Sequence, residues 1–399
     1  MIHTIADAHT ELLLASWART SRPSPLQEML TAASRPGIIS LALGKPDEKL
    51  FPTAEFAQAA QRVLATDPFA LQYGPHSQLL KAQVVELMKR RGVACNEGQV
   101  FLTAGAQQGM CLLARLLLEP GSEVIAEELI YTGFQQVLEP FQPRVLTVPT
   151  SIETGMDVDA VEAHLTRGAR PAFIYAITEG HNPLSVSLSK DKRVRLVELA
   201  RQYGVPIIED DAYGFLCYEG ELEPPLRALD EQYVLYVGSF SKIVAPGLRV
   251  GWLVVPEGLI KPLSIVKEST DIDSTTFPQR VLNAYLETGQ LMDHIKHLCD
   301  QYRLRRDTML DALREHFPEE TRWTTPSSGM FVWLENENVD AAELFDTALS
   351  TAQVAFIPGF LFSVGPVRLK PHSMRLNFSY CSPENIREGI ARLGRLLDH

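Results

Sequence analysis

The sequence predicts an α/β protein with a large domain built on a mostly parallel sheet, followed by a smaller α+β domain. Short apolar segments typical of buried strands alternate with helical segments as far as residue 255, the pattern of a parallel sheet with helices on both faces. Residues 279–316 are typical of a long helix, and further strand-like segments follow. A chain of 399 residues is long enough for two domains. We therefore expect an N-terminal arm over 1–37, a large domain over 38–280 and a small domain over 281–399. The small domain is joined by the long helix and includes part of the N-terminus.

The composition indicates a globular protein without a nucleic-acid or membrane partner. The net charge is −12 and no long basic run occurs, which argues against binding to nucleic acid or anionic lipid. No leader peptide pattern is present, and no apolar run reaches about 18 residues. The five cysteines are widely spaced and odd in number, typical of reduced thiols. We expect a cytoplasmic protein. His294 and His297 have no acidic or cysteine cluster beside them, so no metal site is expected.

The first segments in chain order are typical of a helical arm, a short strand and a turn. Residues 8–33 place leucines and Trp17 on one side, with a break near Pro25. Residues 38–43 then form a short strand that ends in a glycine turn at Gly44. Tyr73 lies in a later turn, where packing is the usual role of a tyrosine.

A strand, a glycine turn and a helix follow over residues 100–118. Gly105, Ala106 and Gln107 stand where the helix begins. Such a start presents free N–H groups and the positive end of the helix dipole, which suits a phosphate. An ordinary turn between a strand and a helix has the same pattern.

The next strands end in polar or aromatic side chains. Residues 123–127 precede Tyr131, and residues 171–177 precede a loop that contains Asn182. The carboxyl ends of strands in open α/β sheets are where ligands bind. Tyr131 could stack on a flat cofactor, and a tyrosine that only packs is the alternative.

The strand over residues 204–210 ends in acidic residues, among them Asp210, and Tyr213 follows three positions later. A carboxylate at this point either caps the next turn or pairs with a ligand cation.

Residues 233–252 contain the most informative pattern. An apolar run typical of a buried strand leads to Ser239, Ser241 and Lys242, and Arg249 follows. Apolar surroundings disfavour a charged lysine, which makes its amine available as a nucleophile. The serine hydroxyls and the guanidinium could together hold a phosphate. A lysine after a strand is more often simply solvated, so the whole segment is needed for the assignment.

The small domain contains one charged residue in an apolar strand. Strand-like segments occur at 330–334, 354–357 and 373–379, and Arg375 lies inside the last of these. A buried arginine without a partner costs several kcal/mol, so we expect Arg375 to bind an anion.

These motifs, in this order, resemble the fold-type I aminotransferases that bind pyridoxal 5′-phosphate (PLP), in the branch containing 2-aminoadipate and aromatic aminotransferases. The resemblance spans about residues 35–395 and is strongest over Tyr236–Trp252. It implies a sheet of the seven-stranded type sandwiched by helices, PLP as cofactor and a homodimer with shared active sites. It also implies exchange of an amino group between an L-amino acid and a 2-oxo acid, in amino-acid metabolism or biosynthesis.

The resemblance implies a role for each candidate residue. Lys242 holds PLP as a Schiff base and moves the Cα proton, while Asp210 pairs with the pyridine nitrogen. It further implies that the phosphate is bound by Gly105, Ala106, Gln107, Ser239, Ser241 and Arg249, and that Tyr73 reaches the phosphate of the other subunit. Tyr131 would stack on the cofactor ring, and Asn182 and Tyr213 would share its phenolic oxygen. The substrate would be bound by Gly44, Asn182 and Arg375.

Three loops depart from the family pattern. Residues 76–78 differ after Tyr73, Glu179 and His181 precede Asn182 where the family has other residues, and Ser185 and Ser328 replace glycines. Glu179 and His181 add titratable groups, so we predict that one of them takes part in substrate-specific acid/base work. Neutral variation of the loop is the alternative.

Two other functions are compatible with parts of this pattern. The same lysine and cofactor also serve β- or γ-elimination, replacement and C–C bond formation, because the surrounding site rather than the fold decides the outcome. A PLP-binding transcriptional regulator has an aminotransferase-like domain after a DNA-binding domain. The acidic chain, with the pattern starting within 40 residues, argues against this.

Overall fold

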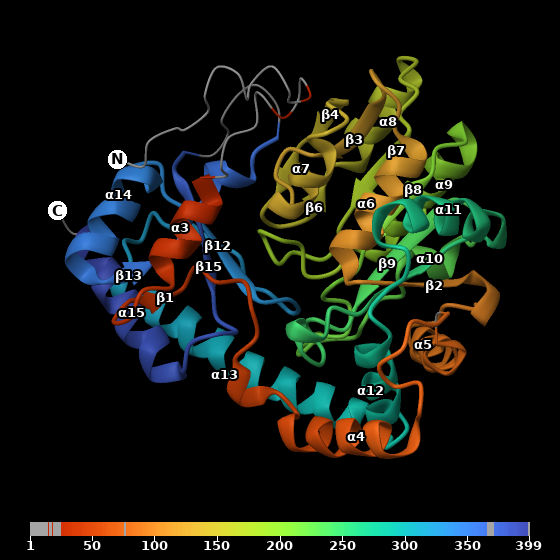
Figure 1. Ribbon diagram of the computed structural model, residues 1–399. Helices are drawn as coiled ribbons and strands as arrows, with labels where there is room; N and C mark the ends of the chain where they lie inside the picture. Colours follow the sequence, from red (N-terminus) through yellow and green to blue (C-terminus); the bar gives the residue numbers. More distant parts are fainter. Residues whose placement is uncertain (1–14, 16–17, 19–24, 76, 365–370, 398–399) are drawn as a thin grey trace.

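The computed structural model describes residues 15, 18, 25–75, 77–364 and 371–397, and its centre is a seven-stranded sheet (Figure 1). The strand order is β2-β10-β9-β8-β7-β3-β4. Neighbouring strands are parallel except at β10, which is antiparallel to β2 and β9. The predicted mostly parallel sheet is confirmed. Its strands are β2 (Val100–Thr103), β3 (Glu123–Glu127), β4 (Arg144–Val148), β7 (Phe173–Ala176), β8 (Ile207–Asp210), β9 (Val234–Ser239) and β10 (Gly251–Val254).

Helices cover both faces of this sheet, as the alternation of segments predicted. Side chains on a strand point alternately to the two faces. In β7, Phe173 and Tyr175 join one buried cluster, whereas Ile174 and Ala176 join the other. The first cluster packs against α6 (Ala106–Leu117), α7 (Thr132–Leu138) and α11 (Ile260–Asp271), and the second against α8 (Val158–Thr166), α9 (Lys190–Tyr203) and α10 (Leu226–Leu229).

The predicted long helix consists of two helices, α12 (Thr276–Leu286) and α13 (Leu291–His316). The break between them contains Gly289, whose φ of +76° is readily adopted only by glycine. Figure 1 shows α13 running along the base of the molecule from the large domain to the small one. Helix α4 (Thr53–Thr66) packs on α12, and α5 (Gln78–Arg90) lies beside them.

The small domain is built on a four-stranded antiparallel sheet with the order β11-β12-β15-β14. Its elements are β11 (Arg322–Trp323), β12 (Phe331–Glu335), β14 (Ile357–Pro358), β15 (Ser373–Asn377), α14 (Ala341–Thr347) and α15 (Pro383–Leu397), the last of which packs on α13.

The segment after the N-terminal arm pairs with the small domain. Strand β1 (Ile39–Ser40) is parallel to β13 (Val354–Ala355), and Leu41 donates to the oxygen of Ala355 at 2.8 Å. Of the helix expected over 8–33, α3 (Pro25–Ala33) is observed, and most of the earlier residues lie outside the described part. A hairpin of β5 (Thr150–Ser151) and β6 (Gly155–Met156) completes the strands described.

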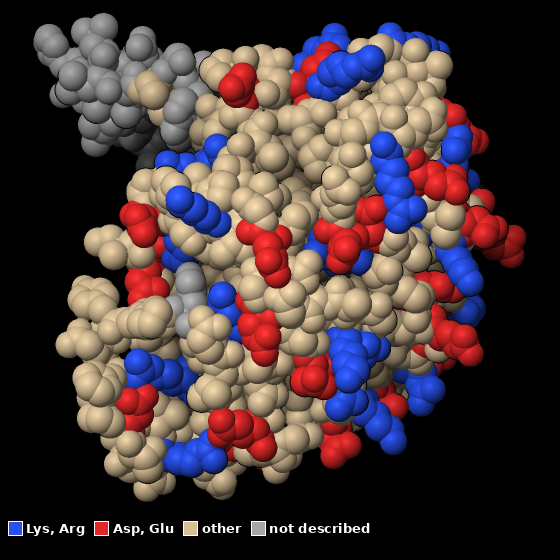
Figure 2. Space-filling model, turned by 90° about the vertical axis from the view of Figure 1, so that its right-hand side faces the viewer, with Lys and Arg blue, Asp and Glu red and all other residues tan. Residues whose placement is uncertain are grey.

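Acidic and basic side chains are interspersed over the face shown in Figure 2. Among the helices in the described ranges, none has the length and apolar character needed to cross a membrane.

Candidate active site

A cavity of about 370 Å³ lies at the carboxyl ends of the parallel strands, and both domains line it. Its walls come from residues that follow β7, β8 and β9, from the start of α6 and from β15 of the small domain. The structure brings together twelve of the predicted residues here: Gly44, Ala106, Gln107, Tyr131, Asn182, Asp210, Tyr213, Ser239, Ser241, Lys242, Arg249 and Arg375.

Lys242 follows the end of β9 and faces this cavity. Its ammonium group donates to the carbonyl oxygen of Gly44 at 2.8 Å. Burial, together with the positive charges of Arg375 and Arg249, lowers the pKa of Lys242 to about 8. An appreciable fraction of the amine is therefore neutral near pH 7 and able to act as a nucleophile.

Asp210 is the last residue of β8 and is buried. One carboxylate oxygen, Oδ2, accepts a hydrogen bond from the hydroxyl of Tyr175 at 2.8 Å. The other oxygen, Oδ1, is buried and has no hydrogen-bond partner among the described residues. Burial raises the pKa of Asp210 to about 6, although the Tyr175 hydrogen bond opposes the shift. A buried carboxylate oxygen without a donor fits a protonated ring nitrogen in the cavity.

An anion seat lies at the start of α6. Gly105 has a φ of +86°, and a Cβ at this position would lie 2.5 Å from Nη2 of Arg249. Glycine therefore allows the guanidinium to lie directly against the start of the helix, where it donates to the oxygen of Ala104 at 2.9 Å. Ser239 and Ser241 also line the cavity. Helix N–H groups, hydroxyls and a guanidinium are the donors that a phosphate requires.

A tyrosine ring forms one wall of the cavity. Tyr131 precedes α7, and a Cβ on Gly133 would lie 2.4 Å from its ring, so this glycine is needed for the ring position. Burial raises the pKa of Tyr131. The ring thus remains a neutral hydroxyl-bearing surface suitable for stacking.

Asn182 connects the two domains across the cavity. Its oxygen accepts a hydrogen bond from Nη1 of Arg375 at 2.8 Å, and its side chain also hydrogen-bonds to Tyr213. Burial is the main cause of a raised pKa at Tyr213, whose hydroxyl therefore remains protonated.

Arg375 is buried in β15 between two aromatic rings. Its guanidinium carbon lies 4.1 Å from the centre of the Phe331 ring and 4.8 Å from that of Phe362. Nη2 donates to the oxygen of Ala42 at 2.9 Å, whereas Nε is buried without a partner in the described part of the chain. Burial lowers the pKa of Arg375 to about 10. No carboxylate of the described residues pairs with this cation, so it can bind one from a ligand.

The departures at Glu179, His181, Ser185 and Ser328 do not line this cavity, and residue 76 lies outside the described residues. Glu179 is buried behind it and binds Arg193, with 2.7 Å between Oε2 and Nη2. His181 is also buried, with Nε2 3.1 Å from Oε2 of Glu127. We predicted that Glu179 or His181 takes part in acid/base work on the substrate. The position of Glu179 argues against this role for Glu179, because its carboxylate has other partners and does not line the cavity. For His181 it stays a prediction.

Three other predicted residues also lie outside the cavity lining. Ser185 has a φ of +52°, at a position where glycine is expected, and its hydroxyl accepts from the N–H of Phe331 at 3.0 Å. Ser328 belongs to the Glu179 contacts. Tyr73 is 85% exposed and does not line the cavity of its own chain.

Sequence reasoning missed several residues that shape the site. Tyr175 orients Asp210, and its position in the alternating pattern of β7 could have indicated that it faces the same layer as α7. Gly133 follows Tyr131 by two residues, which is a detectable signal. Phe362 stacks on Arg375 from a short turn, and nothing in its local sequence indicates this.

Comparison with known proteins agrees with this geometry. The sequence model of the family described as Aminotransferase class I and II matches residues 36–393. The chain belongs to this family. It is 36% identical to the aromatic-amino-acid aminotransferase 1 of Thermococcus litoralis, over 94% of this chain and 92% of that protein. It is 37% identical to the 2-aminoadipate transaminase of Thermus thermophilus, over 94% of each chain.

A solved structure of the same class is also similar. The kynurenine aminotransferase of Pyrococcus horikoshii, in complex with PMP and kynurenine, has a TM-score of 0.92 and 34% identity, over 98% of each chain. This aminotransferase therefore uses PLP and exchanges an amino group between an amino acid and a 2-oxo acid. Its relatives do not favour elimination or C–C bond formation as the reaction. The anion seat, the partnerless oxygen of Asp210 and the amine of Lys242 fit PLP.

Proposed function

We propose that Lys242 holds PLP covalently and carries the Cα proton during amino transfer. The observation that supports this most directly is the pairing of an amine of low pKa with a buried carboxylate oxygen that has no partner, in one cavity. PLP, when bound, takes up the electron pair that is left when the Cα proton is removed. Asp210 holds the pyridine nitrogen in its protonated form.

The other residues bind and orient the reactants. Arg375 binds the α-carboxylate of the amino acid and of the 2-oxo acid, with its cation placed between Phe331 and Phe362. Asn182 and Tyr213 hold the phenolic oxygen of the cofactor, and Tyr131 lies against its ring. The start of α6, Ser239, Ser241 and Arg249 bind the phosphate.

The lining beyond these residues combines apolar and amide side chains. Leu30 and Ile177 are apolar, and Gln27 and Gln136 bear amides. Such a lining suits an amino acid with a large side chain, in line with the aromatic, aminoadipate and kynurenine substrates in the names of its relatives. We infer that these three kinds of amino acid are the donors to test first.

The test replaces the proposed anchor. Lys242→Ala should abolish the yellow colour of the purified protein and the adduct formed on borohydride reduction, while Lys190→Ala, an exposed lysine, should retain both. In the unmodified protein, a suitable donor should convert the bound cofactor to its amine form, measured by absorbance. A reducible adduct in the Lys242→Ala protein would mean that another lysine is the anchor.

We also propose that the enzyme is a homodimer in the cytoplasm with shared active sites. An apolar interface between the two subunits is supported by five exposed apolar side chains, because groups of such side chains mark association sites. They are Phe69, Leu71, Tyr73, Leu79 and Ile272. The loop over residues 67–75 is linked to the start of α12 by a hydrogen bond from Thr276 to the oxygen of Gln72. The N–H of Gly74 also donates to Asp273, the residue after Ile272.

Subunit mixing tests this arrangement. Tyr73 is too exposed to serve its own cavity, so it would serve the other subunit. Inactive Lys242→Ala chains mixed with weakened Tyr73→Phe chains should regain one intact site per mixed dimer. A fully active monomer in sedimentation would rule out the proposal.

A further inference from the structure

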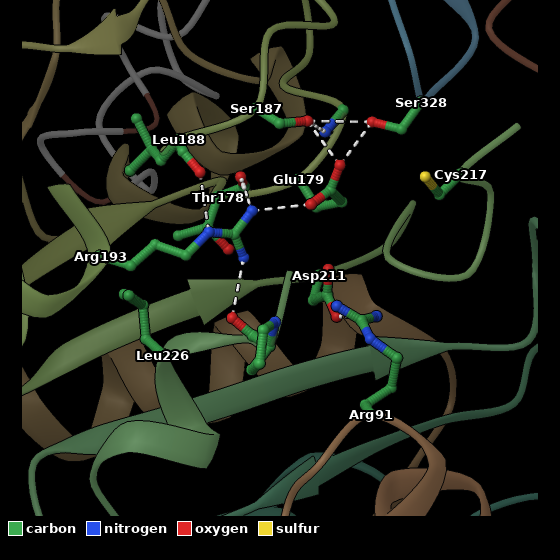
Figure 3. A network of polar contacts seen from close by, with 12 residues as sticks. Arg91, Thr178, Glu179, Ser187, Leu188, Arg193, Asp211, Cys217, Leu226 and Ser328 are labelled. Atoms are coloured by element: carbon green, nitrogen blue, oxygen red, sulfur yellow. Dashed lines mark hydrogen bonds and ion pairs between the residues drawn. The ribbon is translucent and has the colours of Figure 1, made fainter. Parts of the chain in front are cut away.

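A buried network joins Glu179 to three other side chains (Figure 3). Oε1 of Glu179 accepts hydrogen bonds from the hydroxyls of Ser187, at 2.5 Å, and Ser328, at 2.7 Å. Oε2 accepts from Arg193 at 2.7 Å. Arg193 is 1% exposed and also donates to three carbonyl oxygens, those of Leu188, Thr178 and Pro224. The carboxylate is therefore fully satisfied, and we call Glu179, Ser187, Arg193 and Ser328 the Glu179 network.

This network crosses from one domain to the other. Glu179, Ser187 and Arg193 belong to the loop after β7 and to α9 of the large domain, whereas Ser328 precedes β12 of the small domain. The two backbones touch beside it, because a Cβ on Gly180 would lie 2.9 Å from the backbone of Gly329.

Both segments tied by the network carry groups of the active site. The large-domain loop contains Asn182, three residues after Glu179. The small-domain segment leads into Phe331, whose ring lies against Arg375, and Arg375 donates to Asn182 at 2.8 Å. The N–H of Phe331 is bound by the Ser185 hydroxyl at 3.0 Å. A change in the distance between the two segments would therefore change the position of Arg375 relative to Asn182.

We propose that the hydrogen bond between Ser328 and Glu179 is an interdomain latch that positions Arg375 for the carboxylate of the substrate. Glu179 and Ser328 are positioning residues, acting through Phe331 and Arg375 and not on the substrate. This inference rests on the proposed function of Arg375. Arg193 fixes the orientation of the Glu179 carboxylate, so one oxygen is always presented to the small domain.

The position of Ser328 gives a sharp test with a matched control. Ser328→Ala removes the hydroxyl that donates to Glu179, whereas Ser327→Ala removes the neighbouring hydroxyl, which makes none of these contacts. Both variants are compared as PLP-loaded proteins. KM for the amino donor and for the 2-oxo acid is measured, together with kcat and hydrogen exchange of individual amides.

We expect Ser328→Ala to raise both KM values about tenfold, since a hydrogen bond to a charged group is lost, and to change kcat less than about threefold. Both reactants are affected because both have an α-carboxylate. Amide exchange at Gly180 and Phe331 should become faster, because these N–H groups donate to Ser187 and Ser185 at the junction. Ser327→Ala should change none of these quantities.

Any of three results would overturn the latch. One is an unchanged KM and unchanged exchange in Ser328→Ala, and another is an equal change in Ser327→Ala. A KM that stays constant while only the thermal stability falls would also count against it, as it indicates packing alone. If the unmodified protein transferred no amino group, the proposed function would fail, whereas exchange at Gly180 and Phe331 would still test the contact between the domains.

Discussion

Two buried carboxylates follow neighbouring strands of the large domain and differ in how their oxygens are bound. Asp210, at the end of β8, has one oxygen bound by Tyr175 and the other without a partner in the described structure. Glu179, after β7, has both oxygens bound, by Arg193, Ser187 and Ser328. Burial costs the same kind of desolvation at both sites, but only Glu179 has side-chain donors to both of its oxygens.

The difference separates a ligand site from a structural contact. An oxygen that is buried and partnerless persists when a ligand supplies the missing donor. Burial is the main cause that raises the pKa of Asp210 to about 6. A carboxylate with a full set of donors has no capacity left for a substrate. Both are acidic residues at or just after a strand end, so composition and position along the chain do not distinguish them.

The largest expected effect follows from removing the charge of Asp210. Asp210→Asn keeps the shape but cannot hold the pyridine nitrogen in its protonated form, so we expect kcat/KM to fall about 100- to 1,000-fold. Single-turnover measurements with one donor amino acid would show whether the loss is in the proton-transfer step. Comparable activity in Asp210→Asn and the unmodified enzyme would remove Asp210 from the mechanism.

The stability of the PLP-free protein should respond in opposite directions at the two sites. The pKa of Asp210 is raised from 3.8 to about 6 by folding, so its contribution to stability is complete below pH 3.8 and is lost as the pH rises through 6. At pH 8, Asp210→Asn should therefore raise the free energy of unfolding by about 3 kcal/mol.

Glu179→Gln should lower the same free energy by about 3 kcal/mol, because Arg193 loses the charge that compensates it. Denaturant titration of both variants without PLP measures the two changes side by side. Equal signs would mean that the two carboxylates do not differ in the way described.

The fold was largely predictable because it depends on patterns that repeat along the chain. Apolar runs marked the strands of the large sheet, and a glycine turn before α6 marked the start of that helix. Less predictable were contacts between distant segments. The pairing of β1 with β13 joins residues 39–40 to 354–355, and no local pattern in either two-residue strand indicates it.

The residues of the site also differ in how far the sequence alone could predict their roles. Arg375 was identified because a charged residue inside an apolar strand is unusual, whereas Lys242 and Asp210 were identified because the motifs around them, in their order along the chain, resemble those of a known family. Glu179 was also noticed, but sequence alone cannot show which partners a carboxylate has. Ser328 lies 149 residues from Glu179, and only the fold brings the two together.

The pH dependence of PLP attachment tests whether the pKa of Lys242 is lowered in the same cavity as Asp210. Attack on PLP requires the neutral amine, and the pKa of Lys242 is lowered to about 8. The rate at which the PLP-free protein takes up PLP should rise about tenfold per pH unit below pH 8 and level off above it. Stopped-flow absorbance measures this rate. A rate still rising at pH 10 would contradict a lowered pKa.

Removing the Tyr175 hydroxyl is expected to have the smallest effect, and it tests why Asp210 still ionises in a buried position. That hydroxyl donates to Oδ2 and favours the charged carboxylate, so its loss in Tyr175→Phe should raise the pKa of Asp210 further above 6. A single hydrogen bond accounts for up to about one pKa unit. PLP affinity is measured by titration from pH 5 to pH 8. As the pH falls, the affinity of the variant should begin to weaken at a higher pH than that of the unmodified protein. Near pH 8 the two proteins should bind PLP equally well, because Asp210 is ionised in both. Phe134 stacks on the Tyr175 ring at 3.6 Å, so Phe should keep the same position and the change should report on the hydroxyl alone. If PLP affinity weakened at the same pH in both proteins, groups other than the Tyr175 hydroxyl would keep Asp210 ionised.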